Sequence, residues 1–98
     1  MFDKMKQLMN MQKKMQQVKL ELENINFDML SSDGLVNITM NGAQEVKEVS
    51  IKVDLEATEK LSLEKAIKDA YNRAIKRSHE LAAERMKSIT GFNLPGLG

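Results

Sequence analysis

Cysteine is absent from this sequence of 98 residues, and its absence removes several kinds of chemistry at once. Disulfide bridges, thiolate-bound zinc and thiol nucleophiles all depend on cysteine, so none of them is expected here. A chain without disulfides fits a reducing compartment.

Aromatic side chains are also scarce, at 4% of the residues. A core of aliphatic and methionine side chains in so short a chain is thin, because small domains bury a small share of their surface. Two long amphipathic helices, described below, also need something to cover their apolar sides. We therefore expect one domain, residues 1–98, that assembles as a homodimer.

Long apolar runs are missing as well. No segment has the run of about 20 apolar residues that a membrane-spanning helix needs. Residues 1–6 lack the pattern of a secretory signal. We expect no membrane partner.

What the sequence does contain is charge, and this charge is unevenly placed. The net charge is +1, but residues 1–24 carry five Lys against three acids, which gives +2. Residues 25–59 carry two Lys against seven acids, and residues 60–98 carry eight Lys or Arg against four acids. The middle of the chain is therefore acidic and both ends are basic. Such an asymmetry directs a polyanion towards the ends.

Residues 2–24 are predicted to form a long helix. They contain no Gly or Pro and are rich in residues that favour helices. Apolar residues recur every three or four positions, at Met1, Met5, Leu8, Met11, Met15, Val18, Leu22 and Ile25. Such a stripe is most simply a packed seam, although methionine also suits surfaces that accept several partners. A helix lying on a membrane is disfavoured, because Phe2 is its only aromatic anchor.

Residues 25–31 alternate apolar and polar side chains, as a half-buried strand does. The pair Asp33-Gly34 predicts a hairpin turn after them. This turn sets apolar residues opposite each other: Met29 opposite Ile38, and Phe27 opposite Met40. The second strand then turns one apolar side towards the core, namely Val36, Ile38 and Met40.

Asn41-Gly42 is a second turn signal. A strict two-residue loop there would set Lys47 opposite Val36, so we expect a longer loop. The third strand is predicted to bury Val49, Ile51 and Val53. The prediction for residues 25–53 is a three-stranded antiparallel meander, which needs cover from helices or from a partner.

After an acidic connector, residues 62–88 are predicted to form a second long helix with Ser62 as its N-cap. Its apolar stripe contains many alanines, which allow a neighbouring element to approach closely. The stripe consists of Leu63, Ala66, Ile67, Ala70, Tyr71, Ala74, Ile75, Ser78, Leu81, Ala82, Met86 and Ile89. Local ion pairs are expected between Glu64 and Lys68, between Asp69 and Arg73, and between Lys76 and Glu80.

The last residues cannot continue this helix. Gly91 is a natural helix-ending residue, and residues 91–98 are expected to be a flexible tail or to dock through Phe92 and Leu94. The predicted fold class is therefore α+β, with a long N-terminal helix, a three-stranded antiparallel meander and a long C-terminal helix.

No group of residues suggests an active site. His79 is the single histidine, and without a cysteine or a suitably placed acid we expect it to face solvent. The acids within residues 45–59 lack the spacing and the turn glycine of a calcium loop, and no glycine-rich loop precedes a helix to hold phosphate. The strands also lack aromatic platforms for single-stranded nucleic acid. The sequence argues against an enzyme and predicts no cofactor and no metal.

Six features occur in a distinctive order. A Met-, Gln- and Lys-rich helix precedes the stretch GLVNITMNG at residues 34–42, and further motifs follow at Val46–Ile51, Ala70–Ala74 (AYNRA), Glu84–Met86 (ERM) and Thr90–Leu97 (TGFNLPGL). In these segments the chain resembles the YbaB/EbfC family of bacterial nucleoid-associated DNA-binding proteins over nearly its whole length. Two positions depart from the family pattern. Ser31-Ser32-Asp33 precedes Gly34 where the family is richer in glycine, and Phe92 follows Gly91 where a second glycine is common.

The resemblance implies a small cytoplasmic homodimer in which the sheets form the joint and the long helices project like tweezers. It also implies binding of duplex DNA in the nucleoid, with effects on DNA organisation or gene expression. It supplies no fixed set of residues that contact DNA.

Our main hypothesis from the charge distribution is non-enzymatic binding of duplex DNA through its phosphates. The candidate contacts are Lys4, Lys6, Lys13, Lys14 and Lys19 on the first helix, and Lys65, Arg73, Lys76, Arg77 and Lys87 on the second. The first-helix lysines are the stronger candidates, because no acid within residues 4–19 offsets them. The simpler interpretation is that each of these charges only keeps a solvent face soluble.

The alternative hypothesis is a dimeric scaffold or small chaperone that clamps a protein partner with its Met-rich helices. Such binding would depend on apolar residues such as Met5, Met9 and Met15. DNA binding would instead depend on the lysines and would weaken steeply with salt. A dimer that does both is a third possibility.

Overall fold

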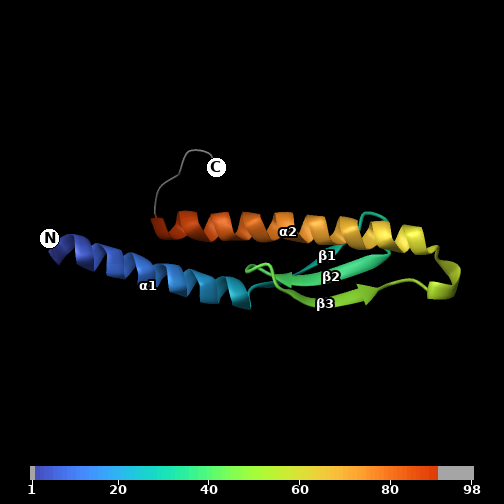
Figure 1. The fold of residues 1–98 in the computed structure, drawn as a ribbon, viewed down its shortest axis with the longest axis horizontal. Coiled ribbons are helices and arrows are strands. Elements are labelled where there is room, and N and C mark those ends of the chain that lie inside the picture. The colour runs from blue at the N-terminus through green and yellow to red at the C-terminus, as the bar shows by residue number, and fades with distance from the viewer. Residues whose placement is uncertain (1, 91–98) are drawn as a thin grey trace.

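Two long helices flank a small antiparallel sheet in the computed structural model, which describes residues 2–90. The elements in chain order are α1 (Phe2–Asn24), β1 (Asn26–Leu30), β2 (Val36–Asn41), β3 (Val46–Ile51), a 3-10 turn η1 (Leu55–Ala57) and α2 (Lys60–Thr90). The sheet has the order β1-β2-β3. Figure 1 shows α2 lying along the sheet, while α1 leaves one end of the sheet and runs away from it. The α+β prediction is confirmed.

Helix α1 spans the predicted residues, but little of its apolar stripe is covered. Val18 and Leu22, near its C-terminal end, are its only buried residues. Towards the N-terminus the side chains of Met5 and Leu8 are 62% and 67% exposed. The predicted packed seam therefore exists within this chain only over the last turns of the helix.

The first hairpin has the predicted register, with Phe27 opposite Met40 and Met29 opposite Ile38. Its loop is longer than the two residues expected, because the last backbone hydrogen bond runs from Ser31 N to Val36 O at 2.8 Å. Gly34 N donates to Ser31 O at 3.0 Å and closes the turn. Gly34 has φ +79°, in the left-handed region that suits glycine.

The second hairpin loop is longer than Asn41-Gly42, as predicted. Gln44 N donates to Asn41 O at 3.2 Å, and Asn41 N donates to Glu45 O at 3.0 Å. Gln44 adopts φ 66° inside this loop. A bulge at residues 39–40 then sets Met40 opposite Val46.

The core lies between α2 and the inner face of the sheet. Three side chains of β2 pack against three alanines of α2: Val36, Ile38 and Met40 against Ala66, Ala70 and Ala74. All six are at most 2% exposed. The alanines have no bulk beyond Cβ, so α2 can approach the sheet closely, as the sequence predicted.

The third strand contradicts the prediction that it buries its apolar side chains. Val49 is 52% exposed and Ile51 is 42% exposed, and Val53 is half-buried beyond the end of β3. Helix α2 packs mainly on β2 and β1. The inner face of β3 therefore lies beside α2 and not beneath it.

Helix α2 begins two residues before the predicted start. Leu63 N donates to Glu59 O at 3.1 Å, so Ser62 lies within the first turn and does not cap the helix. The acidic connector contains η1, which Asp54 caps by accepting from Glu56 N at 3.0 Å. The predictions for Gly91 and for the tail 91–98 lie outside the described residues.

Gly42 joins the end of α1 to the sheet. Its amide donates to Leu22 O at 2.9 Å and to Ile25 O at 3.0 Å, and it thereby satisfies carbonyl groups that a helix end leaves without partners. A Cβ atom at this position would lie 2.8 Å from Leu22 Cδ2 and 3.0 Å from Leu22 O. Only glycine fits between the loop and the helix here.

We predict that Gly42→Ala lowers the free energy of unfolding by about 1–3 kcal/mol, because the added methyl group would be forced against the side chain and the backbone of Leu22. Urea unfolding followed by circular dichroism measures the loss. The matched control is Gly34→Asn, since nothing lies within 4 Å of a Cβ there and Asn tolerates the left-handed region. The control should lose less than about 1 kcal/mol. Equal losses for the two variants would contradict the steric argument.

Candidate nucleic-acid interface

The five lysines of α1 carry charge that no acid compensates. Lys4, Lys6, Lys13, Lys14 and Lys19 are exposed, and the helix has no acidic residue between Asp3 and Glu21. Among residues 2–90, none of these lysines lies within 4 Å of a carboxylate. A cation without a local partner is free to neutralise a phosphate.

These lysines surround α1 and do not share one face. Lys6 and Lys13 are seven residues apart, so they project from the same side, opposite the buried pair Val18 and Leu22. Lys4 lies on the apolar side, where it lines a cavity of about 370 Å³ together with Leu8. A DNA duplex that approaches α1 from any of several sides would therefore meet a lysine side chain.

Lys14 faces α2 across a polar cavity of about 340 Å³ that it lines with Gln17, Glu21, Arg85 and Ser88. Arg85 Nη1 lies 3.8 Å from Glu21 Oε2. Arg85 was not among the predicted contacts. Its position beside Lys14 depends on how the two helices cross, which no local sequence pattern reveals.

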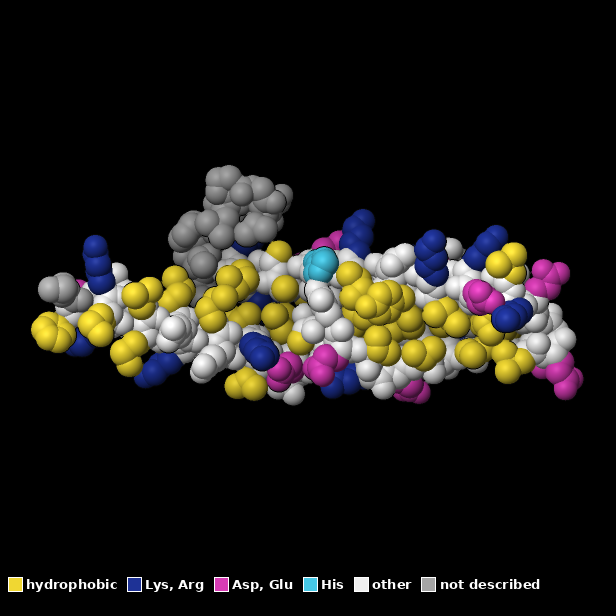
Figure 2. All heavy atoms as spheres, in the orientation of Figure 1, with side chains coloured by type: hydrophobic (Ala, Val, Ile, Leu, Met, Phe, Trp, Pro, Cys, Tyr) yellow, Lys and Arg dark blue, Asp and Glu magenta, His cyan; other side chains and the backbone are white. Residues whose placement is uncertain are grey.

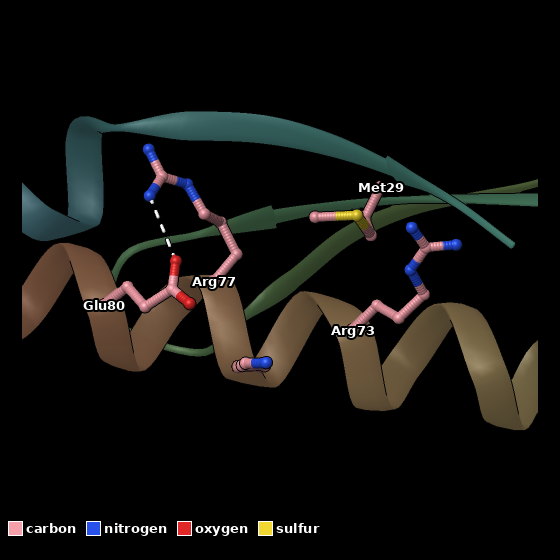
Figure 3. A pocket seen from close by; sticks show the side chains of 5 residues that line it. Met29, Arg73, Arg77 and Glu80 are labelled. Carbon is pink, nitrogen blue, oxygen red and sulfur yellow. Dashed lines mark hydrogen bonds and ion pairs between the residues drawn. The ribbon is translucent and has the colours of Figure 1, made fainter. Parts of the chain in front are cut away.

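The basic cluster of α2 lies where the helix passes β1. Figure 3 shows Arg73 and Arg77 extending from α2 on either side of Met29, around a cavity of about 280 Å³. Arg77 Nη1 lies 3.3 Å from Glu80 Oε2 and 3.9 Å from Glu84 Oε1. The charge of Arg77 is thus largely compensated by its own helix.

Arg73 is also paired, at 3.9 Å from Asp69 Oδ2. Asp69 in turn accepts from Ser32 N at 2.8 Å, which ties α2 to the first hairpin loop. Lys76 lines the same cavity as the two arginines and has no carboxylate within 4 Å among the described residues. Lys76 is therefore the stronger candidate of this cluster.

The predicted local ion pairs have mixed outcomes. The Asp69–Arg73 pair is present. The predicted partner of Glu80 was Lys76, but Glu80 pairs with Arg77. Glu64 and Lys68, both within the described part of the chain, do not form an ion pair.

The remaining predicted contacts on α2 are far apart. Lys65 is exposed in its early turns and Lys87 is half-buried near its end, about 33 Å away at 1.5 Å per residue. The structure therefore brings the ten predicted residues together only in part. It forms one group on α1 and a second around Arg73, Lys76 and Arg77.

The outer face of the sheet is polar and carries an acidic group that stays ionised. Asp28 Oδ1 accepts from Thr39 Oγ1 at 2.5 Å and from Asn37 Nδ2 at 3.3 Å. The Thr39 hydroxyl foremost, then the Asn37 amide, holds the pKa of Asp28 below its ordinary value, with a further contribution from the charge of Lys52. The face away from α2 thus keeps negative charge well below neutral pH, which disfavours a polyanion there.

A patch of exposed apolar side chains lies on the other side of the molecule. Figure 2 shows hydrophobic side chains gathered over the sheet and α2. The exposed residues include Val46, Val49 and Ile51 of β3 and Ile67 and Tyr71 of α2. We call these five residues the β3–α2 strip. Contiguous apolar surface of this kind marks an interaction site.

The sequence profile of the YbaB/EbfC DNA-binding family matches residues 1–93. The chain belongs to this family. The profile covers every element described above, so the resemblance noted in the sequence is confirmed.

Individual relatives of this YbaB/EbfC chain carry the name nucleoid-associated protein. One from Dictyoglomus thermophilum is 41% identical over 59 residues, which cover 60% of this chain and 55% of the relative. One from Hahella chejuensis is 42% identical over 60 residues, which cover 61% of this chain and 56% of the relative. The chain thus spans about half the length of the relatives that it matches.

A solved structure shares the fold. The crystal structure of an uncharacterized Helicobacter pylori protein matches with a TM-score of 0.65, covering 89% of this chain and 98% of the other. The two sequences are 22% identical. This likeness supports the arrangement of helices and sheet alone.

Two other kinds of site are absent from the described residues. No helix within residues 2–90 is long and apolar enough to cross a membrane. The same residues contain no cluster of three or more side chains suited to hold a metal ion. His79 is exposed on α2, as predicted.

We predict that Thr39→Val raises the pKa of Asp28 towards its ordinary value, because it removes the strongest hydrogen bond to the carboxylate. A lowered pKa in the folded state stabilises the fold above the unfolded-state pKa, and this contribution is lost as pH falls through the lowered value. The variant should therefore lose less stability on acidification than the parent.

Carboxyl-resolved NMR titration measures this change. Asp33 is the internal control, because its pKa is lowered by the Ser31 hydroxyl and then by the Leu35 amide, neither of which the substitution touches. If the pKa of Asp28 stayed in place, the assigned cause would be wrong.

Proposed function

We propose that this chain is a non-enzymatic nucleoid-associated protein that binds duplex DNA as a homodimer, with effects on nucleoid organisation or gene expression. The observation that carries the proposal is the uncompensated positive charge on α1, a helix that projects beyond the sheet. Membership of a DNA-binding family supports the same ligand. The names of its relatives support the nucleoid, and hence the cytoplasm, as the location.

Phosphate neutralisation is the mechanism that this arrangement suits. Helix α1 has 23 residues and is about 35 Å long, so it can follow several phosphates of a duplex that carries one charge per about 1.7 Å of its axis. Lysines spread around the helix give affinity without a fixed set of base contacts. The expected result is binding that depends strongly on salt and little on sequence.

Charge compensation ranks the candidate contacts. The five α1 lysines and Lys76 of α2 have no acid within 4 Å among residues 2–90, whereas Arg73 and Arg77 are held by acids of their own helix. We rank the α1 lysines first. Lys65 and Lys87 come last, because they lie at opposite ends of α2.

The exposed surface of the single chain supports a homodimer. The chain exposes 7419 Å², whereas a compact monomer of its 11.1 kDa mass exposes about 5,700 Å². Its extents of 66 × 25 × 16 Å describe an elongated body about two layers thick. A second copy would cover part of the excess.

The β3–α2 strip is the surface we assign to this dimer. Its three β3 residues lie on the inner face of the sheet, beside α2 and next to the free edge of β3, and its other two residues, Ile67 and Tyr71, belong to α2. An exposed edge strand with apolar side chains favours association with another chain. Two strips meeting around a twofold axis would bury each other, and the α1 helices would project from the joint as the arms of tweezers.

A different observation supports a second candidate function. Met5, Leu8, Met9, Met11 and Met15 are exposed on α1, and adaptable methionine surfaces bind protein partners. In this alternative, a dimeric scaffold or small chaperone clamps a protein. The salt dependence of the next experiment separates the two functions, because apolar clamping does not weaken with salt.

We predict that replacing Lys6, Lys13 and Lys14 together with Ala reduces the slope of log affinity against log salt by about 3 for each α1 helix of the dimer that contacts the duplex, since each lost phosphate contact removes roughly 0.9. Fluorescence anisotropy with duplexes of unrelated sequence, at several salt concentrations, measures the slope. The matched control replaces Lys47, Lys52 and Lys60, which removes the same charge from β3, the connector after it and the first residue of α2. An unchanged slope in the α1 variant, or an equal drop in the control, would rule out the α1 contacts.

We predict that Val49→Asp weakens the dimer by about 100-fold or more, because an unpaired carboxylate would be buried in the joint. Sedimentation equilibrium at several protein concentrations measures the dissociation constant. The control is Leu30→Asp, which adds the same charge on the outer face of the sheet, where Leu30 is 47% exposed. A dimer that persists in the Val49 variant would show that the strip is not the joint.

A further inference from the structure

Two polar residues lie near the C-terminal end of α1, which we call its base. They are buried more completely than any other polar side chains of the described chain. Asn41 and Ser78 are both 0% exposed. Their side-chain atoms all have hydrogen-bond partners. Buried polar groups with complete partners hold one geometry, because any other arrangement leaves one of them without a partner.

Asn41 connects the end of α1 to the second hairpin loop. Its Nδ2 donates to Glu23 O at 3.1 Å and to Glu45 Oε1 at 2.9 Å. Its Oδ1 accepts from Ala43 N at 3.0 Å and from Glu45 N at 2.9 Å. One side chain thus shapes the loop and also holds a carbonyl group of the last turn of α1.

Ser78 brings α2 to the same place. Its hydroxyl lies 3.0 Å from Gly42 O and 3.3 Å from Asn41 O. The amide of Gly42 already holds Leu22 O and Ile25 O. The end of α1, the loop of the sheet and the middle of α2 therefore meet in one network.

Little else determines the direction of α1. Only Val18 and Leu22 are buried along its length, and the Glu21–Arg85 ion pair at 3.8 Å is about half exposed, so it contributes little. We propose that Asn41 and Ser78 are positioning residues, which hold α1 at a fixed angle to α2 and so set the spacing between the α1 lysines and the basic cluster of α2. This inference rests on the proposed DNA binding for its consequence, but the angle itself is a property of the free protein.

The geometry amplifies small changes at this base. From Leu22 to Gln7 the helix runs about 22 Å, so a rotation of about 10° at the base moves Gln7 by about 4 Å. A shift of that size exceeds the spacing of successive charges on a duplex. Neither Asn41 nor Ser78 could touch DNA, yet both would affect how many phosphates the lysines reach.

The experiment measures the distance between α1 and α2 directly. Because the chain has no cysteine, spin labels at Gln7→Cys and Asn72→Cys are unique, and both sites are exposed. The labelled chain is diluted into an excess of unlabelled chain, so that pulsed electron paramagnetic resonance reports pairs within one chain. Ser78→Ala should broaden the distance distribution or move its mean by about 4 Å.

Two further variants separate positioning from stability. Glu45→Ala removes one hydrogen-bond partner of Asn41 from an exposed position. It should therefore shift the distance between the two labels in the same way without creating a cavity in the core. Thr39→Val removes a hydroxyl on the outer face and should leave the distance unchanged. If Ser78→Ala and Glu45→Ala only lowered the melting temperature and kept the parent distance distribution, the positioning role would be overturned.

DNA titration supplies the functional readout. Ser78→Ala should lower the salt slope by about one or more, although the residue is fully buried. A changed distance with an unchanged slope would also count against the proposal, since the angle would then not matter for binding. Failure of the parent protein to bind DNA would count against the proposed function alone, because the distance measurement needs no DNA.

Discussion

Close packing between the alanines of α2 and the side chains of β2 is the contact on which the rest of the molecule depends. Ala66, Ala70 and Ala74 face Val36, Ile38 and Met40. A helix about 10 Å wide covers little more than two strands that lie about 4.8 Å apart. With α2 seated on β2 and β1, the inner face of β3 lies outside this cover, and its apolar side chains stay exposed in the single chain.

The same arrangement separates the charges of the molecule. The sheet contributes the acidic part of the chain, and Asp28 on its outer face is kept ionised by neighbouring hydrogen bonds. The two helices carry most of the basic residues, but with different effect. Acids three, four or seven positions away hold Arg73 and Arg77 of α2, whereas α1 has no acid along its middle. Sequence composition alone makes both helices basic, and the ion pairs distinguish the paired arginines of α2 from the unpaired lysines of α1 and Lys76.

Local patterns in the sequence predicted the elements and the pairing of the strands, because periodicity and turn residues act over short distances. The register of Met29 with Ile38 and the bounds of α1 are confirmed. Burial of β3 was predicted wrongly, since a stripe of apolar residues does not say which element covers it. The proximity of Arg85 to Lys14 and the network around Ser78 depend on how distant segments cross. Such crossings follow from tertiary packing, and no spacing along the chain encodes them.

The exposure of α1 has a consequence for the thermodynamics of binding. A helix anchored only at its last turns resembles an isolated peptide towards its N-terminus, and the ends of such helices fray. The first turn of α1, which precedes Gln7, would therefore fray in the free protein and become ordered along a bound polyanion. Association would then include part of the folding of α1, so the measured affinity would contain an entropic cost that grows with temperature, and a helix-favouring substitution could tighten binding without touching the ligand.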